Sequence, residues 1–155
     1  MNEQEKQATL TALRLLAATP KSKVRLKQKL KEKGYPSQVI EETLGRLEQD
    51  GILNDKNFAA SVFQTFSQYR PSGRKRIVFE MKKRGIGERV ISETLQTFDA
   101  GAEREAALGL AEAKLNRWQK LEPARRRKKI YDFLIRRGFD FTLSREIVDG
   151  VGKRQ

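Results

Sequence analysis

Three segments of the chain share one pattern of apolar residues and glycine. Residues 22–47 align with residues 73–98 at an offset of 51 residues, and these align with residues 126–151 at a further 53. The glycine recurs in register as Gly34, Gly85 and Gly138. Self-similarity at a fixed period indicates stacked supersecondary units, each marginally stable alone. The sequence therefore predicts a tandem array in which each unit packs mainly on its neighbours.

Apolar residues recur at six aligned positions, with the spacing of an α-helix. They are Leu26, Ile77 and Ile130; Leu30, Met81 and Leu134; Tyr35, Ile86 and Phe139; Val39, Val90 and Leu143; Leu44, Leu95 and Val148; and Leu47, Phe98 and Val151. We expect Leu30, Met81 and Leu134 to be buried, one in the core of each unit.

The same periodicity predicts nine helices, three in each unit, and no strand. Their expected ranges are 4–18, 22–33 and 37–49; 55–69, 73–84 and 88–98; and 101–117, 123–137 and 141–150. Ser22 and Ser37 are expected N-caps, and the repeated glycine is expected at positive φ just past the second helix of each unit. The predicted fold class is all-α, with three three-helix bundles at residues 1–51, 52–100 and 101–155 in an elongated array.

Positive charge follows the same period. The windows 21–33, 72–84 and 125–137 hold seven, six and seven basic residues and one acid each, which gives them a summed charge of +17. The net charge of the whole chain is +13, so the residues outside these windows sum to −4. Three cationic segments on a slightly acidic body indicate a surface for a polyanion, with nucleic acid the commonest candidate. The alternative is that each segment is an ordinary solvated helix face, because Lys and Arg favour helices.

Three basic positions persist in every unit. They are Lys23, Arg74 and Arg127; Arg25, Arg76 and Lys129; and Lys33, Arg84 and Arg137. The last set is expected at helix C-termini, where a cation offsets the helix dipole. The first two sets lie at helix starts, where the dipole disfavours cations, so we interpret them as part of a binding face.

The candidate DNA- or filament-binding residues combine these positions with a basic turn and a basic run. They are Lys23, Arg25, Arg70, Arg74, Lys75, Arg76, Arg125, Arg126, Arg127, Lys128 and Lys129. Tyr69, Trp118 and Tyr131 adjoin basic residues and are candidates for stacking on bases, although aromatic residues at helical spacing more often belong to a core.

Composition excludes several kinds of chemistry. The chain contains no cysteine and no histidine, so thiolate and imidazole metal sites and Ser-His-Asp or Cys-His catalysis are ruled out. No phosphate-binding glycine loop, membrane helix or signal peptide is recognisable. We therefore expect a cytoplasmic, monomeric protein without catalytic residues, metal, cofactor or membrane partner.

Three motifs follow one another along the chain. They are Gly51-Ile52-Leu53-Asn54-Asp55-x-x-Phe58-Ala59, then Arg76-Ile77-x-x-Glu80-Met81-x-x-Arg84-Gly85-Ile86 in the centre, and Lys129-Ile130-x-x-Phe133-Leu134-x-x-Arg137-Gly138-Phe139 near the end. All three resemble signatures of the RecX family, the regulators of the RecA recombinase. The resemblance covers residues 8–151. One departure is Arg25, which stands where the family pattern has a capping-box glutamate.

The resemblance implies a curved, elongated molecule of three three-helix bundles and a non-enzymatic function. Such proteins bind the groove of the RecA–DNA filament, contact single- and double-stranded DNA, and inhibit ATPase activity, strand exchange and filament extension, in DNA repair and the SOS response. A stand-alone helix-turn-helix DNA-binding module is the first alternative, although Gln28 is the only amide within the three windows that could read bases. An RNA-binding α-repeat protein is disfavoured because its repeats are shorter than the period of this chain. An enzyme is disfavoured because the chain lacks the usual catalytic residues.

Overall fold

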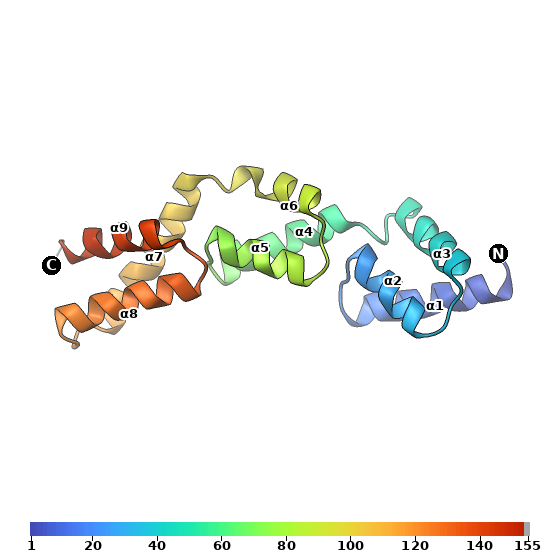
Figure 1. Cartoon of the computed structure of the whole chain (residues 1–155), viewed down its shortest axis with the longest axis horizontal. Coiled ribbons are helices and arrows are strands. Elements are labelled where there is room, and N and C mark those ends of the chain that lie inside the picture. Colours follow the sequence, from blue (N-terminus) through green and yellow to red (C-terminus); the bar gives the residue numbers. More distant parts are fainter. Residues whose placement is uncertain (154–155) are drawn as a thin grey trace. The chain divides into compact units, whose positions relative to one another are not determined.

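A computed structural model describes residues 1–153, and these residues form nine α-helices and no strand (Figure 1). The first three helices are α1 (Glu3–Ala18), α2 (Lys23–Glu32) and α3 (Ser37–Gln49). The next are α4 (Asp55–Gln64), extended by the π-helical turn η1 (Thr65–Tyr69), α5 (Arg74–Lys83), and α6 (Glu88–Thr94), extended by the 3₁₀ turn η2 (Leu95–Thr97). The last are α7 (Ala100–Arg117), α8 (Pro123–Arg136) and α9 (Phe141–Gly152). The all-α prediction is confirmed, and the helix ends agree within two residues once the turns η1 and η2 are counted with the helices they extend.

The chain forms two compact units. The first holds residues 1–61 and 81–91, and the second holds residues 62–80 and the chain from residue 92 onward. The division passes through α4, α5 and α6, so each of these helices contributes to both units. The three-unit division at 1–51, 52–100 and 101–155 stays a prediction.

In the first unit, α1, α2 and α3 enclose one apolar core. The core side chains are Ala12, Leu26, Leu30, Ile40, Leu44, Leu47 and Leu53. The Oγ atom of Ser22 caps α2 by accepting from the backbone N–H of Arg25 at 3.2 Å, as predicted. The predicted cap at Ser37 is wrong, because Pro36 occupies the N-cap position and Ser37 is already helical. Asn2 and Glu5 form a capping box on α1 that the sequence analysis missed.

In the second unit, α7, α8 and α9 pack around another core. Its buried side chains are Ala107, Ala111, Ile130, Leu134, Phe139, Ile147, Val148 and Val151. The ring of Trp118 packs edge-on against Phe133 with 6.4 Å between centroids, and Phe63 packs likewise on Phe98 at 5.5 Å. The predicted core set Leu30, Met81 and Leu134 is fully buried.

The repeated glycine ends the second helix of each repeat in the same way. Gly34, Gly85 and Gly138 have φ of 91°, 80° and 91°, a region that glycine adopts without strain. The N–H of the following residue donates to the carbonyl of Leu30, Met81 and Leu134 respectively, at 3.1 to 3.3 Å. This is the hydrogen bond of a Schellman motif. The repeat in the sequence is therefore a repeated helix stop whose acceptor is the buried core residue.

Within the second unit, the start of α5 packs directly against the turn between α8 and α9. The N–H of Gly73 donates to the carbonyl of Arg137 at 2.7 Å, and the N–H of Lys75 donates to that of Gly138 at 3.2 Å. A Cβ atom added to Gly73 or Gly138 would lie well under 3.0 Å from backbone atoms of the other segment. Both glycines are needed for this backbone contact, which we call the Gly73–Gly138 junction.

Candidate nucleic-acid interface

The first set of repeated cations is held by contacts within the protein. The ammonium of Lys23 lies 2.5 Å from the Glu48 carboxylate, and this hydrogen bond raises the pKa of Lys23. The Arg74 guanidinium donates to the carbonyl of Phe98 at 3.1 Å. The Arg127 guanidinium pairs with the carboxylate of Asp149. All three side chains remain partly exposed, but each is stabilised at its helix start by a partner within the protein.

The second set is held in a similar way. The Arg25 guanidinium donates to the carbonyl of Lys83 at 2.9 Å, near the end of α5. The Nε atom of Arg76 lies 3.0 Å from a carboxylate oxygen of Glu80, which is buried. The Lys129 ammonium lies 4.6 Å from the centroid of the Trp118 ring. Cations at helix starts thus have intramolecular partners that offset the unfavourable dipole, and their part in a binding face stays a prediction.

Arg137 serves a purpose that the sequence analysis missed. Its Nε and Nη2 atoms donate to the carbonyl of Pro71 at 3.0 and 2.6 Å, so the guanidinium binds the turn before α5 with two donors. Burial lowers the pKa of Arg137, and the charges of Arg76 and Arg70 lower it further. The main contact of its guanidinium is therefore the turn before α5, beside the Gly73–Gly138 junction. Interaction with the dipole of its own helix is secondary.

Arg126 is the predicted site residue whose placement differs most from expectation. It is only 7% exposed, and its Nη1 atom donates to the carbonyl of Gln119 at 3.1 Å. The reason is helical register, because Arg126, Ile130 and Leu134 are spaced four residues apart and all are buried on one face of α8. We therefore remove Arg126 from the candidate surface. The spacing was visible in the sequence, but the run of five basic residues obscured it.

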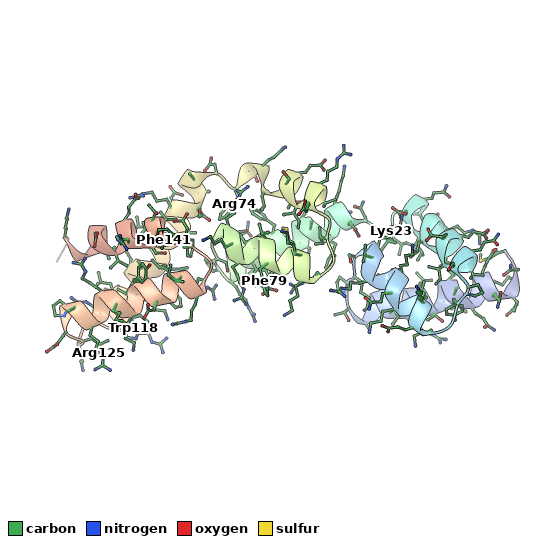
Figure 2. The ribbon with its side chains drawn as sticks, in the orientation of Figure 1. Lys23, Arg74, Phe79, Trp118, Arg125 and Phe141 are labelled. Carbon is green, nitrogen blue, oxygen red and sulfur yellow. The ribbon has the colours of Figure 1, made fainter. Side chains whose placement is uncertain are left out.

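The remaining predicted cations are exposed and suited to phosphate contact. Arg70, Lys75 and Arg125 are exposed and have no acidic partner in the described part of the chain. Lys128 is also exposed, although its ammonium lies 3.3 Å from the carboxylate of Asp132. Figure 2 shows Arg125 near the first turn of α8 and Arg74 at the start of α5. Arg136 and Arg145 are exposed in the same way and were not singled out in the sequence analysis.

The three candidate aromatic residues have different surroundings. Tyr69 is 75% exposed, whereas Tyr131 is half-buried beside the core of the second unit. The ring of Trp118 already has two ammonium groups near it, those of Lys129 at 4.6 Å and Lys114 at 5.2 Å. Trp118 is consequently the least available of the three for stacking on a base.

Within residues 1–153, no cluster of three or more acidic side chains is placed to hold a metal ion. Over the same residues, no helix has the length and apolarity needed to cross a bilayer.

Comparison with known proteins identifies the family. Two family models match, the first three-helix domain of RecX at residues 8–47 and the third three-helix domain at residues 102–148. The regulatory protein RecX of Pelodictyon phaeoclathratiforme is 39% identical over 130 residues, which cover 84% of this chain and 79% of that protein. The protein of the same name from Chlorobaculum tepidum is 35% identical over 149 residues, covering 96% and 91%.

Solved structures agree with this assignment. The crystal structure of RecX from Lactobacillus salivarius has the same fold, with a TM-score of 0.83 at 23% identity and 97% coverage of both chains. Another crystal structure of a regulatory protein RecX has a TM-score of 0.76 at 26% identity, covering 95% of this chain and 72% of that one. On its sequence relatives, its matched domains and its fold, the chain belongs to the RecX family.

Proposed function

We propose that this protein is a non-enzymatic regulator that binds the filament of a RecA recombinase on DNA. Bound in the filament groove, it lowers the recombinase ATPase, strand exchange and filament extension, and so modulates recombination during DNA repair and the SOS response. The observation that carries this proposal is similarity over nearly the whole chain to proteins named regulatory protein RecX.

The exposed cations support a direct contact with the filament's DNA. Arg70, Lys75 and Arg125 are free of acidic partners in the described structure, and Lys128 keeps much of its surface exposed. Each phosphate contact releases counterions and is weak alone, but several contacts made together gain avidity when the geometry allows simultaneous binding. Binding of this kind is independent of base sequence, which suits a filament that forms on any sequence.

The side-chain inventory supports regulation without catalysis. The whole chain lacks histidine and cysteine, the usual acid–base, nucleophilic and metal-binding residues. We infer that the protein acts by occupying a surface and not by chemical turnover, and that its setting is the cytoplasm, where the recombinase works.

The test is recombinase ATPase activity on single-stranded DNA, measured as this protein is titrated in. We expect activity to fall as the protein saturates the filament. The double variant Arg70→Gln with Arg125→Gln should need a higher concentration for the same inhibition, because two phosphate contacts are lost. Lys6→Gln with Arg14→Gln is the matched control, since it removes two exposed positive charges from α1 in the first unit and should inhibit like the parent.

A stand-alone DNA-binding module is the competing function, favoured by the same exposed cations. Co-sedimentation separates the two, with the protein incubated with recombinase filaments or with bare DNA of equal length. A filament regulator is retained more strongly by filaments. Equal retention by bare DNA, together with unchanged ATPase activity, would show that the recombinase is not its partner.

A further inference from the structure

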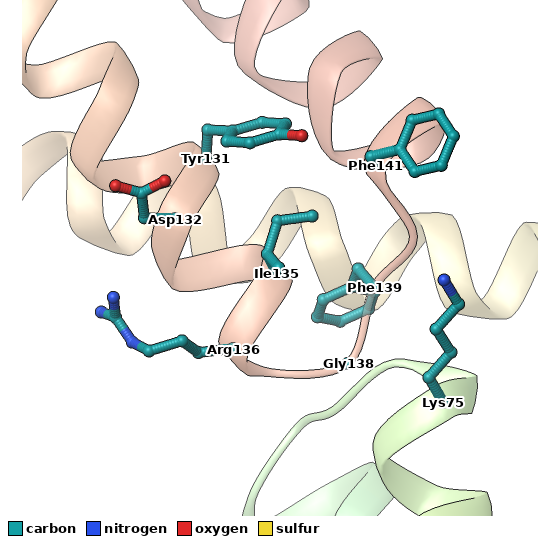
Figure 3. A pocket seen from close by; sticks show the side chains of 8 residues that line it. All are labelled: Lys75, Tyr131, Asp132, Ile135, Arg136, Gly138, Phe139 and Phe141. Carbon is teal, nitrogen blue, oxygen red and sulfur yellow. The ribbon is translucent and has the colours of Figure 1, made fainter.

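In the second unit, a furrow follows the seam between α8 and α9. One hollow of about 520 Å³ is lined by Lys75, Tyr131, Ile135, Arg136, Phe139 and Phe141 among others (Figure 3). A second hollow of about 360 Å³ is lined by Arg127, Lys128, Tyr131, Arg145 and Asp149 among others. Tyr131 lines both hollows, so they are neighbours on either side of its residue. We call the pair the α8–α9 furrow.

The furrow is rimmed by an excess of positive charge. Its five cations are Lys75, Arg127, Lys128, Arg136 and Arg145. Its two carboxylates are already paired, Asp132 with Lys128 and Asp149 with Arg127. Lys75 and Arg136 in the first hollow and Arg145 in the second have no acidic partner in the described structure. A ligand that follows the furrow meets unpaired cations along its length.

Apolar side chains are exposed between these cations. Phe141 is 60% exposed and Ile135 is 38% exposed, and both line the first hollow together with the buried Phe139. In Figure 3, the rings of Tyr131 and Phe141 stand on the same side of the hollow, above Ile135 and Phe139, and the Lys75 ammonium extends toward Phe141. Exposed aromatic rings that alternate with cations along a groove are the features that bind single strands of nucleic acid without sequence preference.

We propose that the α8–α9 furrow binds a single strand of DNA, with bases stacked on Phe141 and Tyr131 and phosphates on Lys75, Arg136 and Arg145. A duplex does not fit this arrangement, because its bases already stack on each other and present no free faces. An acidic protein segment would satisfy the charge but has no need of an exposed phenylalanine ring beside a half-buried tyrosine ring. This inference extends the proposed function by naming where a single strand binds. It rests on the proposed function only for the assumption that the ligand is DNA.

The test compares two labelled oligonucleotides by fluorescence anisotropy with the full-length protein. One is oligothymidylate of about twelve nucleotides, a typical site length for such grooves, and the other is an abasic oligomer with the same number of phosphates. We expect the parent protein to bind oligothymidylate at least about fivefold more tightly, which is the smallest stacking contribution of one base. Equal affinity for the two oligomers would overturn the proposal.

Phe141→Leu is the decisive variant, because it keeps an apolar side chain at the first position of α9 but removes the ring. The Asp140 side chain still caps that helix through its bond to the N–H of Leu143 at 2.8 Å, so the fold should persist. We expect its affinity for oligothymidylate to fall by about fivefold or more, with abasic binding unchanged. Tyr131→Phe keeps the ring and should bind like the parent. A Phe141→Leu protein that binds oligothymidylate like the parent would contradict base stacking.

The charge contribution is tested by Arg136→Gln with Arg145→Gln. On a single strand, this pair should reduce the log–log salt slope by about 0.7 for each lost phosphate contact, for both oligomers. Lys6→Gln with Arg14→Gln is the matched control, because both residues are exposed on α1 in the first unit. An unchanged slope in the furrow variant would overturn the assignment of phosphates to these residues.

Recombinase inhibition, measured with the same variants, separates this inference from the proposed function. If Phe141→Leu binds oligothymidylate like the parent but no longer binds the recombinase, the furrow is a protein-binding site; the inference is then wrong while the proposed function stands. If the parent discriminates the two oligomers and Phe141→Leu loses that discrimination, but the parent inhibits no recombinase, the furrow assignment stands and the proposed function fails.

Discussion

Substitution of the repeated glycine by alanine should cost a different amount of stability in each repeat, although the backbone conformation is nearly the same. Gly34 and Gly138 share φ of 91°, and Gly85 has 80°. A left-handed conformation costs an alanine about 1–2 kcal/mol, of which about 0.4–1 kcal/mol is offset because alanine also restricts the unfolded chain. Around Gly34 an added Cβ meets nothing within 4 Å. We therefore expect Gly34→Ala to lower the free energy of unfolding by about 1 kcal/mol.

Gly138→Ala carries an additional steric cost. The added Cβ would fall well under 3.0 Å from the backbone N and the Cβ of Arg76, so the Gly73–Gly138 junction has to open. Overpacking of this kind costs about 1–3 kcal/mol, which brings the expected total to about 2–4 kcal/mol. Gly85→Ala should lie between the two, because its Cβ would approach Ser22 Oγ at 2.8 Å and disturb the cap of α2.

The assay is urea unfolding followed by far-ultraviolet circular dichroism, with residue-resolved hydrogen exchange to assign each loss to its unit. The expected order of cost is Gly34→Ala, then Gly85→Ala, then Gly138→Ala. Gly73→Ala offers a further check, because Gly73 lacks the positive φ but makes the same close approach. If Gly138→Ala costs no more than Gly34→Ala, the close backbone contact does not exist in solution and the reasoning is refuted.

Three further predictions follow from single contacts. Arg137→Lys should lower the free energy of unfolding in urea by about 1.5–3 kcal/mol, because a lysine cannot reproduce the two donors that bind the Pro71 carbonyl. A decrease below the error of the measurement would show that these two hydrogen bonds are dispensable. Leu30→Ala and Leu134→Ala should each cost about 2–5 kcal/mol in thermal unfolding, and surface-like behaviour of either would mean that its burial is wrong. Arg74→Gln should lower stability and leave the salt dependence of DNA binding intact, whereas Lys75→Gln should do the reverse; the same effect from both would contradict the distinction between held and free cations.

Much of the fold could be predicted from the sequence because local signals set the helices. Proline and glycine mark where helices end, and apolar spacing sets the face that each helix buries. The incorrect prediction of Ser37 as the N-cap of α3 has a local cause as well. Pro36 holds the extended conformation that an N-cap requires, so the helix begins one residue earlier than a serine cap implies.

Contacts between helices could not be predicted in the same way. The division into two compact units passes through α4, α5 and α6, and no composition change or flexible linker in the sequence marks it. The Gly73–Gly138 junction joins residues far apart in the chain, and Gly73 carries no local signal beyond a permissive turn. Pairing of this kind depends on the shapes of both surfaces, which a single sequence does not display.

The candidate site was predictable as a class of surface but not residue by residue. A count of charge cannot tell an arginine that donates to a carbonyl, such as Arg74, from an exposed one without an acidic partner in the described structure, such as Arg70. It also cannot tell which residues of the run 125–129 face the core, although helical register assigns Arg126 to the buried face. Repetition alone does not separate binding from packing, because a position that recurs in all repeats can serve the repeated fold.

The structure therefore separates two kinds of basic residue. Those that recur in register mostly have acceptors on neighbouring segments, so their repetition follows from the repeated packing. Those around the α8–α9 furrow that lack acidic partners, Lys75, Arg136 and Arg145, do not form an aligned set across the repeats. A cation that is neither packed in the fold nor bound to an internal acceptor contacts solvent or is available to a ligand. For this reason the search for the binding surface should start from those charges of the second unit that do not recur in all three repeats. A simultaneous change of Arg74, Lys75 and Arg76 would confuse loss of packing with loss of binding.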